Sequence, residues 1–151
     1  MERSGAMQEV NIYVQATAKG PAIRKKAAYV YIIQLKEGKE YIRRGEGVLE
    51  NVTENQIVLT AIIKALMRFN QKCTIRINTE CEHVLNSCRN GWPYQWQKNG
   101  WKKASGKDVK NAELWQQYIN VSNGHAISWS DERHEFSTWM EDELKKMEAQ
   151  W

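Results

Sequence analysis

The 151-residue sequence predicts a single α/β domain, a mixed five-stranded sheet with helices on both faces. Three extended segments come first, and later strand-like segments are separated by helical ones. The expected order is β-β-β-α-β-α-α-α-β-α. In this order the early strands form an antiparallel meander, and the later strands run parallel to the first. We expect residues 1–8 to be a flexible N-terminus.

The first three strands are predicted from local patterns. In VNIYV, which starts at Val10, apolar residues alternate with polar ones, as in a strand with one buried face. Lys19–Pro21 breaks this strand. Ala27–Leu35 is rich in β-branched and aromatic residues and predicts the second strand. A hairpin turn at Lys36–Lys39, which contains a glycine, leads to a third strand over about 40–49.

Helices dominate the rest of the chain. Thr53 begins the first long helix, because Gln56 three residues later completes a capping box. Apolar residues at helical spacing from Val58 to Phe69 predict one buried face of this helix. Two short strands and four further helices are expected. The strands are Cys73–Asn78 and Ala126–Ser130, and the helices are Glu82–Arg89, Pro93–Lys98, Lys110–Asn120 and Phe136–Gln150.

Composition bounds the function only loosely. The net charge of +4 permits an acidic partner without identifying one. The three cysteines form no CxxC motif and no even-numbered framework, which favours reduced thiols and argues against a structural zinc site. The N-terminus lacks an apolar signal core, and the longest apolar run is too short to cross a bilayer. We therefore expect a cytoplasmic protein with no membrane partner.

The segment NGWKKASGKDVKNAELWQQY, which starts at Asn99, combines many lysines with tryptophans. Its motif GWK, followed by VKN-x-ELW, resembles the bacterial ribonuclease H type I family. The resemblance covers nearly the whole chain, from Val10 to about Met147, and is most specific over Trp96–Gln117. It implies a ribonuclease H-like fold. Three tryptophans match the family's structural ones, namely Trp96, Trp101 and Trp115.

In that family, the corresponding segment is a helix, a basic protruding loop and a second helix, and the loop grips nucleic acid. The resemblance implies that Trp101 anchors the loop and that its lysines contact the backbone, namely Lys98, Lys102, Lys103, Lys107 and Lys110. Exposed lysines would give sequence-independent affinity by releasing counterions from phosphates. Alternatively, the lysines are only solvated charge and the tryptophans only core, and for the tryptophans we favour the core interpretation.

The start of the first long helix adds a second expected contact. In TENQ, Thr53 and Asn55 match positions that resemble the family's contacts to backbone phosphate and minor groove. Glu54 departs from the pattern, because it places a carboxylate where an amide is common. Thr53 is also expected to cap the helix.

The resemblance further implies four carboxylates that hold two divalent cations. Here the matching positions are Gln15 in IYVQA, Val58 in NQIVL, Glu80 in NTECE and Asp142 in DEL, with Glu141 as a rival to Asp142. His134 in DERHEF is the nearest match to the family's mobile histidine. Two of the four carboxylates are missing, so we expect no bound metal, with Glu80 and Asp142 as ligands if there is one. We also expect the four positions to lie close together.

Three functions remain open from the sequence. The favoured one is a nucleic-acid-binding domain that does not cleave RNA/DNA hybrids, because it needs the basic loop and tolerates the lost carboxylates. The second is a residual ribonuclease that cleaves the RNA strand of such hybrids with Mg²⁺ or Mn²⁺, using Gln15, Glu80, Glu82 and Asp142. The third is a protein-interaction domain on the same scaffold.

Overall fold

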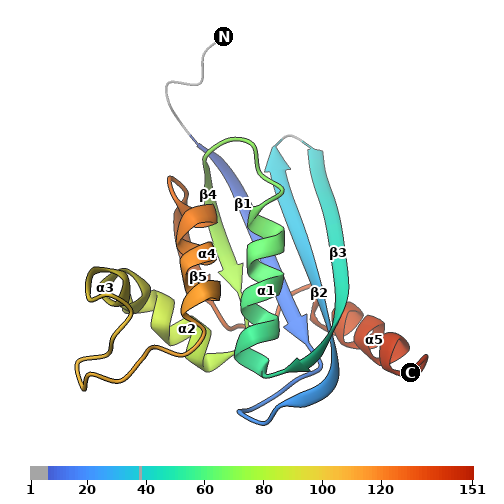
Figure 1. Cartoon of the computed structure of the whole chain (residues 1–151). Coiled ribbons are helices and arrows are strands. Elements are labelled where there is room, and N and C mark those ends of the chain that lie inside the picture. Colours follow the sequence, from blue (N-terminus) through green and yellow to red (C-terminus); the bar gives the residue numbers. More distant parts are fainter. Residues whose placement is uncertain (1–6, 38) are drawn as a thin grey trace.

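The computed structural model describes residues 7–37 and 39–151, which form one five-stranded sheet with helices on both faces (Figure 1). The strand order is β3-β2-β1-β4-β5. The strands are β1 (Gln8–Ala16), β2 (Arg24–Glu37), β3 (Lys39–Val52), β4 (Cys73–Asn78) and β5 (Ala126–Ser130). β1 and β3 each pair antiparallel with β2, whereas β4 pairs parallel with β1 and β5. The predicted mixed sheet is confirmed.

The helices follow the predicted order. They are α1 (Glu54–Leu66), α2 (Glu82–Arg89), α3 (Trp92–Lys98), α4 (Ala112–Ser122) and α5 (Ser137–Glu148). The capping box of α1 is present, because the Thr53 hydroxyl accepts from the Gln56 N–H and the Gln56 carboxamide accepts from the Thr53 N–H. Within the described residues, no helix is long and apolar enough to cross a membrane.

Several predicted boundaries need correction. α1 ends at Leu66, so Phe69 lies beyond it and packs on the core from the following turn. The hairpin is tighter than expected, since β2 reaches Glu37 and β3 begins at Lys39; Gly38 itself lies outside the described residues. β1 already begins at Gln8, inside the stretch predicted to be flexible, and residues 1–6 lie outside the described part.

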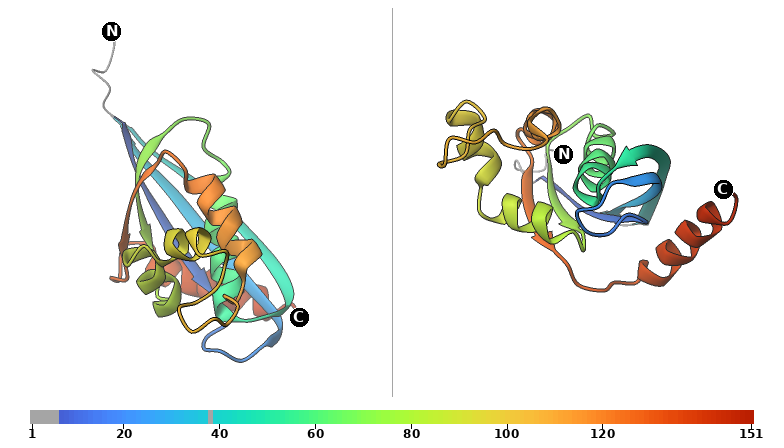
Figure 2. Two further views of the ribbon diagram at one scale, coloured as in Figure 1. Left: turned by 60° about the vertical axis from the view of Figure 1, so that its left-hand side comes forward. Right: turned by 60° about the horizontal axis from the view of Figure 1, so that its bottom comes forward.

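The sheet separates two cores. The larger one lies under α1 and α4, which pack side by side on one face, and α5 covers the other face (Figure 2). On that second face, Met140 and Leu144 of α5 pack against alternate residues of β2, namely Ala28, Val30 and Ile32. Because successive side chains of a strand point to opposite faces, the apolar residues of β1 enter the larger core. Tyr13 and Gln15 of β1 instead face the α5 side.

Candidate functional site

The loop between α3 and α4 extends away from the sheet beside α2 and α3 (Figure 1), and we call residues 99–111 the protrusion. Its base is closed by backbone hydrogen bonds. The Trp101 N–H donates to the Trp96 carbonyl at 2.7 Å, and the Val109 N–H donates to the Trp101 carbonyl at 3.0 Å. Near the tip, the Lys103 N–H donates to the Lys107 carbonyl at 2.8 Å. The protrusion is therefore a closed loop with a fixed base.

Aromatic packing supports that base. Trp115 of α4 is 1% exposed and meets Trp96 edge to face, with ring centroids 5.6 Å apart. Trp101 is half-buried against the same core and has a left-handed backbone, with φ of 63°. The core interpretation holds for Trp115, whereas Trp101 joins the core to the protrusion.

The five lysines of this region are all exposed, namely Lys98, Lys102, Lys103, Lys107 and Lys110. The Lys102 ammonium pairs with the Asp108 carboxylate across the loop. An exposed pair of this kind contributes little to stability. The lysines are thus available to solvent or to an anionic partner.

Beside the protrusion lies a hollow of about 860 Å³, which we call the basic hollow. Its lining comes from α1, α2, α3 and the protrusion. The lining residues are Asn55, His83, Trp92, Gln95, Trp96, Lys98, Asn99, Lys102, Lys103, Ala104, Val109, Lys110 and Asn111. The structure therefore brings Asn55 together with four of the five predicted lysines, whereas Lys107 is not part of the lining.

Sequence reasoning missed several residues of this hollow. His83 on α2 carries no motif that marks it; burial lowers its pKa, and the nearby Lys103 lowers it further. Asn111 has a left-handed backbone, with φ of 61°, and precedes α4 as its N-cap. This conformation explains why α4 begins at Ala112 and not at Lys110. The readiness of asparagine to adopt a left-handed backbone was a usable signal.

The start of α1 is hydrogen-bonded to Asn111, which precedes α4, and to Cys81, which precedes α2. The Gln56 carboxamide donates to the Asn111 side-chain oxygen at 3.1 Å. The Cys81 thiol donates to the Asn55 side-chain oxygen at 3.2 Å. Burial raises the pKa of Cys81 to about 11, so the group remains a thiol donor. Asn55 is therefore held at the rim of the basic hollow.

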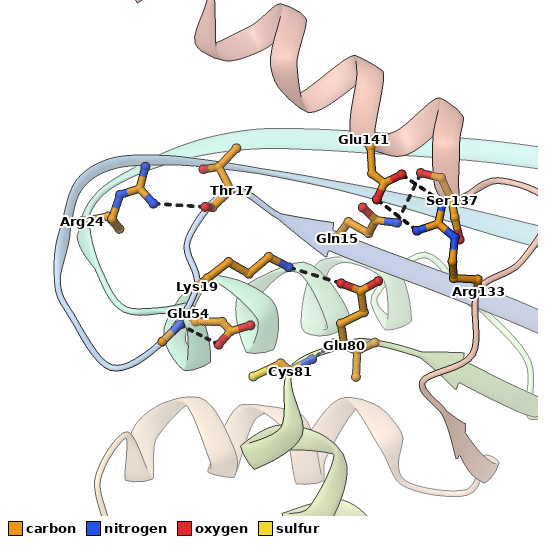
Figure 3. Close-up of polar contacts among 12 residues, drawn as sticks. Gln15, Thr17, Lys19, Arg24, Glu54, Glu80, Cys81, Arg133, Ser137 and Glu141 are labelled. Atoms are coloured by element: carbon orange, nitrogen blue, oxygen red, sulfur yellow. Dashed lines mark hydrogen bonds and ion pairs between the residues drawn. The ribbon is translucent and has the colours of Figure 1, made fainter.

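The side chain of Glu54 contacts the loop between β1 and β2 and is not part of the lining of the basic hollow. Its carboxylate accepts a hydrogen bond from the Gly20 N–H at 3.0 Å, in the loop between β1 and β2 (Figure 3). The departure from an amide at this position therefore has a structural use, since the carboxylate holds this loop against α1.

The first two positions predicted to match carboxylates cannot supply charge. Gln15 is buried on β1, and its amide donates to the Ser137 carbonyl at 3.5 Å (Figure 3). Val58 is 3% exposed and belongs to the core under α1. The four predicted positions thus do not form one polar set, because Val58 is part of the apolar packing.

Of the other two positions, Glu80 carries a carboxylate that is already paired, whereas Asp142 carries an exposed carboxylate. Glu80 follows β4 and lies 3.6 Å from the Lys19 ammonium. On α5, Asp142 is exposed, and Glu141 accepts two hydrogen bonds from the Arg133 guanidinium at 3.0 and 3.2 Å. Since neighbouring helix residues point about 100° apart, only one of the two can face this region. The contacts favour Glu141, the rival position.

We call Lys19, Glu80, Arg133 and Glu141 the ion-pair cluster (Figure 3). Hydrogen bonds from Arg133 hold the pKa of Glu141 below its usual value, with Lys19 contributing in the same direction. Glu141 in turn raises the pKa of Arg133, and Glu80 adds to this effect. The four side chains therefore form two ion pairs that lie near each other.

His134 is held beside this cluster. Its ring packs on Tyr13 with centroids 4.1 Å apart, and its Nδ1 accepts from the Phe136 N–H at 3.1 Å. Burial lowers the pKa of His134, and Arg133 lowers it further. The neutral imidazole is therefore part of the packed loop before α5.

These residues do not fit a centre of two divalent cations. Mg²⁺ prefers several anionic oxygen ligands. Here one position is an amide, one is an alkyl side chain, and of the two carboxylates Glu80 is paired with Lys19 while Asp142 is exposed. Across residues 7–37 and 39–151, no three His, Cys, Asp or Glu side chains are grouped to hold a metal ion.

The sequence of this chain is similar to those of known proteins. Residues 7–131 match the RNase H family. A ribonuclease H of Cupriavidus necator is 34% identical over 123 residues, which cover 82% of this chain and 81% of the relative. A ribonuclease H of Francisella tularensis subsp. novicida is 39% identical over 83 residues, which cover 55% of this chain and 54% of the relative.

Solved structures share the fold. LC9-RNase H1, described as a type 1 RNase H with the type 2 active-site motif, superposes with a TM-score of 0.73 at 19% identity, over 93% of this chain and 70% of that one. LC11-RNase H1, solved in complex with an RNA/DNA hybrid, gives a TM-score of 0.66 at 13% identity, over 94% and 99%. At these identities the likeness shows the fold alone.

Proposed function

Because this chain belongs to the RNase H family, we propose that it binds the backbone of an RNA/DNA hybrid in the basic hollow. The observation that carries the proposal is the convergence of Asn55 with Lys98, Lys102, Lys103 and Lys110 around one hollow of about 860 Å³. Ammonium groups neutralise phosphates without reading sequence, and an amide can donate to a groove edge. LC11-RNase H1 was solved with such a hybrid.

We further propose that the chain does not cleave the bound RNA strand with Mg²⁺ or Mn²⁺. Metal-assisted hydrolysis of a phosphodiester needs ions that stabilise both the attacking and the leaving oxygen. The donor set of Gln15, Val58, Glu80 and Asp142 provides two carboxylates, and both Glu80 and the neighbouring Glu141 have a cation of the chain beside them. This donor set supports the proposal that a bound hybrid is not cleaved.

A residual ribonuclease is the second candidate. It is favoured by the name of the Cupriavidus necator relative, a ribonuclease H that matches 82% of this chain at 34% identity. In that case Gln15, Glu80, Glu82 and Asp142 would hold the metal ion, and Glu80 would have to exchange its partner Lys19 for it.

One assay separates these candidates. A hybrid labelled on its RNA strand is incubated with the protein in EDTA, Mg²⁺ and Mn²⁺, and binding and cleavage are read from native and denaturing gels. We expect a shifted, intact hybrid under all three conditions. Metal-dependent RNA fragments would favour the residual ribonuclease. No shift in any condition would favour a protein-interaction domain.

We also propose that the protein acts in the cytoplasm. The three cysteines are free, and each is buried or half-buried. Such thiols are typical of a reducing compartment.

A further inference from the structure

The ion-pair cluster lies where the family resemblance places metal ligands. Lys19 comes from the loop after β1, Glu80 follows β4, Arg133 follows β5 and Glu141 lies on α5. These residues come from three stretches of the chain, around Lys19, Glu80 and 133–141, which converge beside Gln15 (Figure 3). The cations of this site are therefore supplied by the chain itself.

The balance of charges at this site explains why it does not need a divalent cation. Four carboxylates with two divalent cations form a neutral site, and so do two carboxylates with two side-chain cations. Gln15 and Val58 remove two negative charges from the expected set, and Lys19 and Arg133 balance Glu80 and Glu141. An added divalent cation would meet two positive charges nearby, which disfavours its binding.

Both cations remain accessible. The side chains of Lys19 and Arg133 are 57% and 61% exposed. An ammonium has three donors and a guanidinium has five, so pairing with one carboxylate leaves donors for a phosphate oxygen. Arg133 already donates to both oxygens of Glu141 and to the Thr138 hydroxyl, so a phosphate oxygen would accept from its remaining N–H groups.

The cluster also adjoins the basic hollow. Glu80 is followed directly by Cys81, whose thiol donates to Asn55 at 3.2 Å, and Asn55 lines the hollow. A nucleic-acid backbone that leaves the hollow past Asn55 therefore reaches the cluster next.

We propose that Lys19 and Arg133 contact the phosphate backbone of the bound hybrid directly, so that binding at the former metal position needs no divalent cation. This inference rests on the proposed function, because it assigns further phosphate-binding groups to the same interface.

The test measures anisotropy of a fluorescent RNA/DNA hybrid in EDTA and in Mg²⁺ at matched ionic strength. For the unmodified protein we expect affinities equal within about twofold. Lys19→Ala and Arg133→Ala should each weaken binding about two- to fivefold. Each should also lower the slope of log affinity against log salt by about one unit. The matched control is Lys146→Ala, which removes the same charge from an exposed lysine 3.6 Å from Glu143 on α5.

A second variant, Glu80→Gln, should change the affinity for the hybrid in opposite directions under direct contact and under metal-bridged contact. Glu80→Gln removes a carboxylate that repels phosphate, so direct contact predicts binding about two- to fivefold tighter in both buffers. If Glu80 held a metal ion that bridged to phosphate, the same variant would weaken binding in Mg²⁺. Thermal unfolding of each variant establishes that it is folded.

The outcomes separate the two proposals. If the unmodified protein fails to bind in either buffer, the proposed function falls and this inference with it. If it binds, but Lys19→Ala and Arg133→Ala behave like Lys146→Ala, only this inference is overturned. Binding that requires Mg²⁺ and is lost in Glu80→Gln also overturns this inference alone.

Discussion

At the scale of single residues, Val58 shows best how this site departs from a metal centre. It lies one turn into α1, is 3% exposed and packs in the core under that helix. A carboxylate at this position would lose its hydration unless it turned toward the ion-pair cluster. The direction of this side chain therefore matters for both stability and function.

We expect Val58→Glu to destabilise the protein by roughly 3 kcal/mol, because it buries a polar group without a partner. Urea unfolding measures the change. Two control variants separate charge from size. Val58→Gln introduces a side chain of the same shape as glutamate without its charge, and Val58→Ile keeps position 58 apolar. A stable Val58→Glu variant that gains Mg²⁺-dependent thermal stability would show instead that position 58 opens onto the former metal site.

Thiol reactivity is a second property of single residues. Burial raises the pKa of Cys81 to about 11 and that of Cys88 to about 12, and it raises the pKa of Cys73 as well. Since the thiolate is the reactive form, all three should resist modification near neutral pH. We expect slow labelling by a thiol-reactive dye in buffer and rapid labelling of three groups in denaturant. Fast native labelling of one cysteine would indicate local opening around it.

At the scale of elements, the protrusion separates binding from stability. Its lysines are exposed, and its base is held by Trp101 through bonds to Trp96 and Val109. Charge and anchoring thus reside on different side chains of one loop.

Replacing Lys102, Lys103 and Lys107 together with alanine should therefore weaken hybrid binding and leave the unfolding temperature nearly unchanged. Each phosphate contact that is lost should lower the salt slope by about one unit. Lys107 is not part of the lining of the basic hollow, so Lys107→Ala alone should have the smallest effect. An unchanged affinity and salt slope in the triple variant would mean that the lysines are only solvated charge.

Trp101→Ala should behave in the opposite way to the lysine variants. The ring is half-buried against the core, and the residue connects Trp96 to Val109 through its backbone. Its removal should lower the free energy of unfolding by about 2 kcal/mol or more and loosen the protrusion. Hydrogen exchange of the Val109 N–H reports the loosening. Equal exchange rates in both proteins would show that the tryptophan is not the anchor.

The same elements show what the sequence could predict. β4, β5 and α2 have the predicted bounds, because local periodicity and end signals specify them. α4 began two residues late, because the left-handed Asn111 ends the protrusion, and no period in the sequence marks this conformation.

The ion-pair cluster lay beyond sequence reasoning. Lys19 meets Glu80 only through the tertiary fold, since the two are far apart along the chain, whereas Arg133 pairs with Glu141 across the loop before α5. The choice between Glu141 and Asp142 depended on where α5 begins and how it turns over the sheet. Sequence spacing alone defines neither the start of α5 nor its orientation over the sheet. The positions matched to the family therefore located the region of the site but not its side-chain contacts.

At the scale of the whole molecule, the three histidines share one property. Burial is the largest cause that lowers the pKa of each, and a nearby cation adds to it: Lys103 beside His83, Lys72 beside His125 and Arg133 beside His134. The folded protein therefore binds fewer protons than the unfolded chain just below the ordinary histidine pKa. Stability linked to these groups is complete above about pH 7 and falls as the pH decreases.

The cysteines give the opposite dependence at high pH. Their pKa values are raised by burial, so the unfolded chain loses thiol protons first as the pH rises past their ordinary range. Stability should therefore be greatest between the histidine and cysteine ranges and should fall on both sides.

We expect the free energy of unfolding by urea to be lower at about pH 5.5 than at about pH 7.5. His134→Asn provides the internal control. An asparagine side-chain oxygen can accept the Phe136 N–H in place of Nδ1, and it does not titrate in this range. The variant should therefore keep most of its stability at the higher pH and lose less of it on acidification. Equal stability at both pH values in the unmodified protein would mean that the histidines take up protons in the folded state without penalty, and that the packing around them is looser than the structure describes.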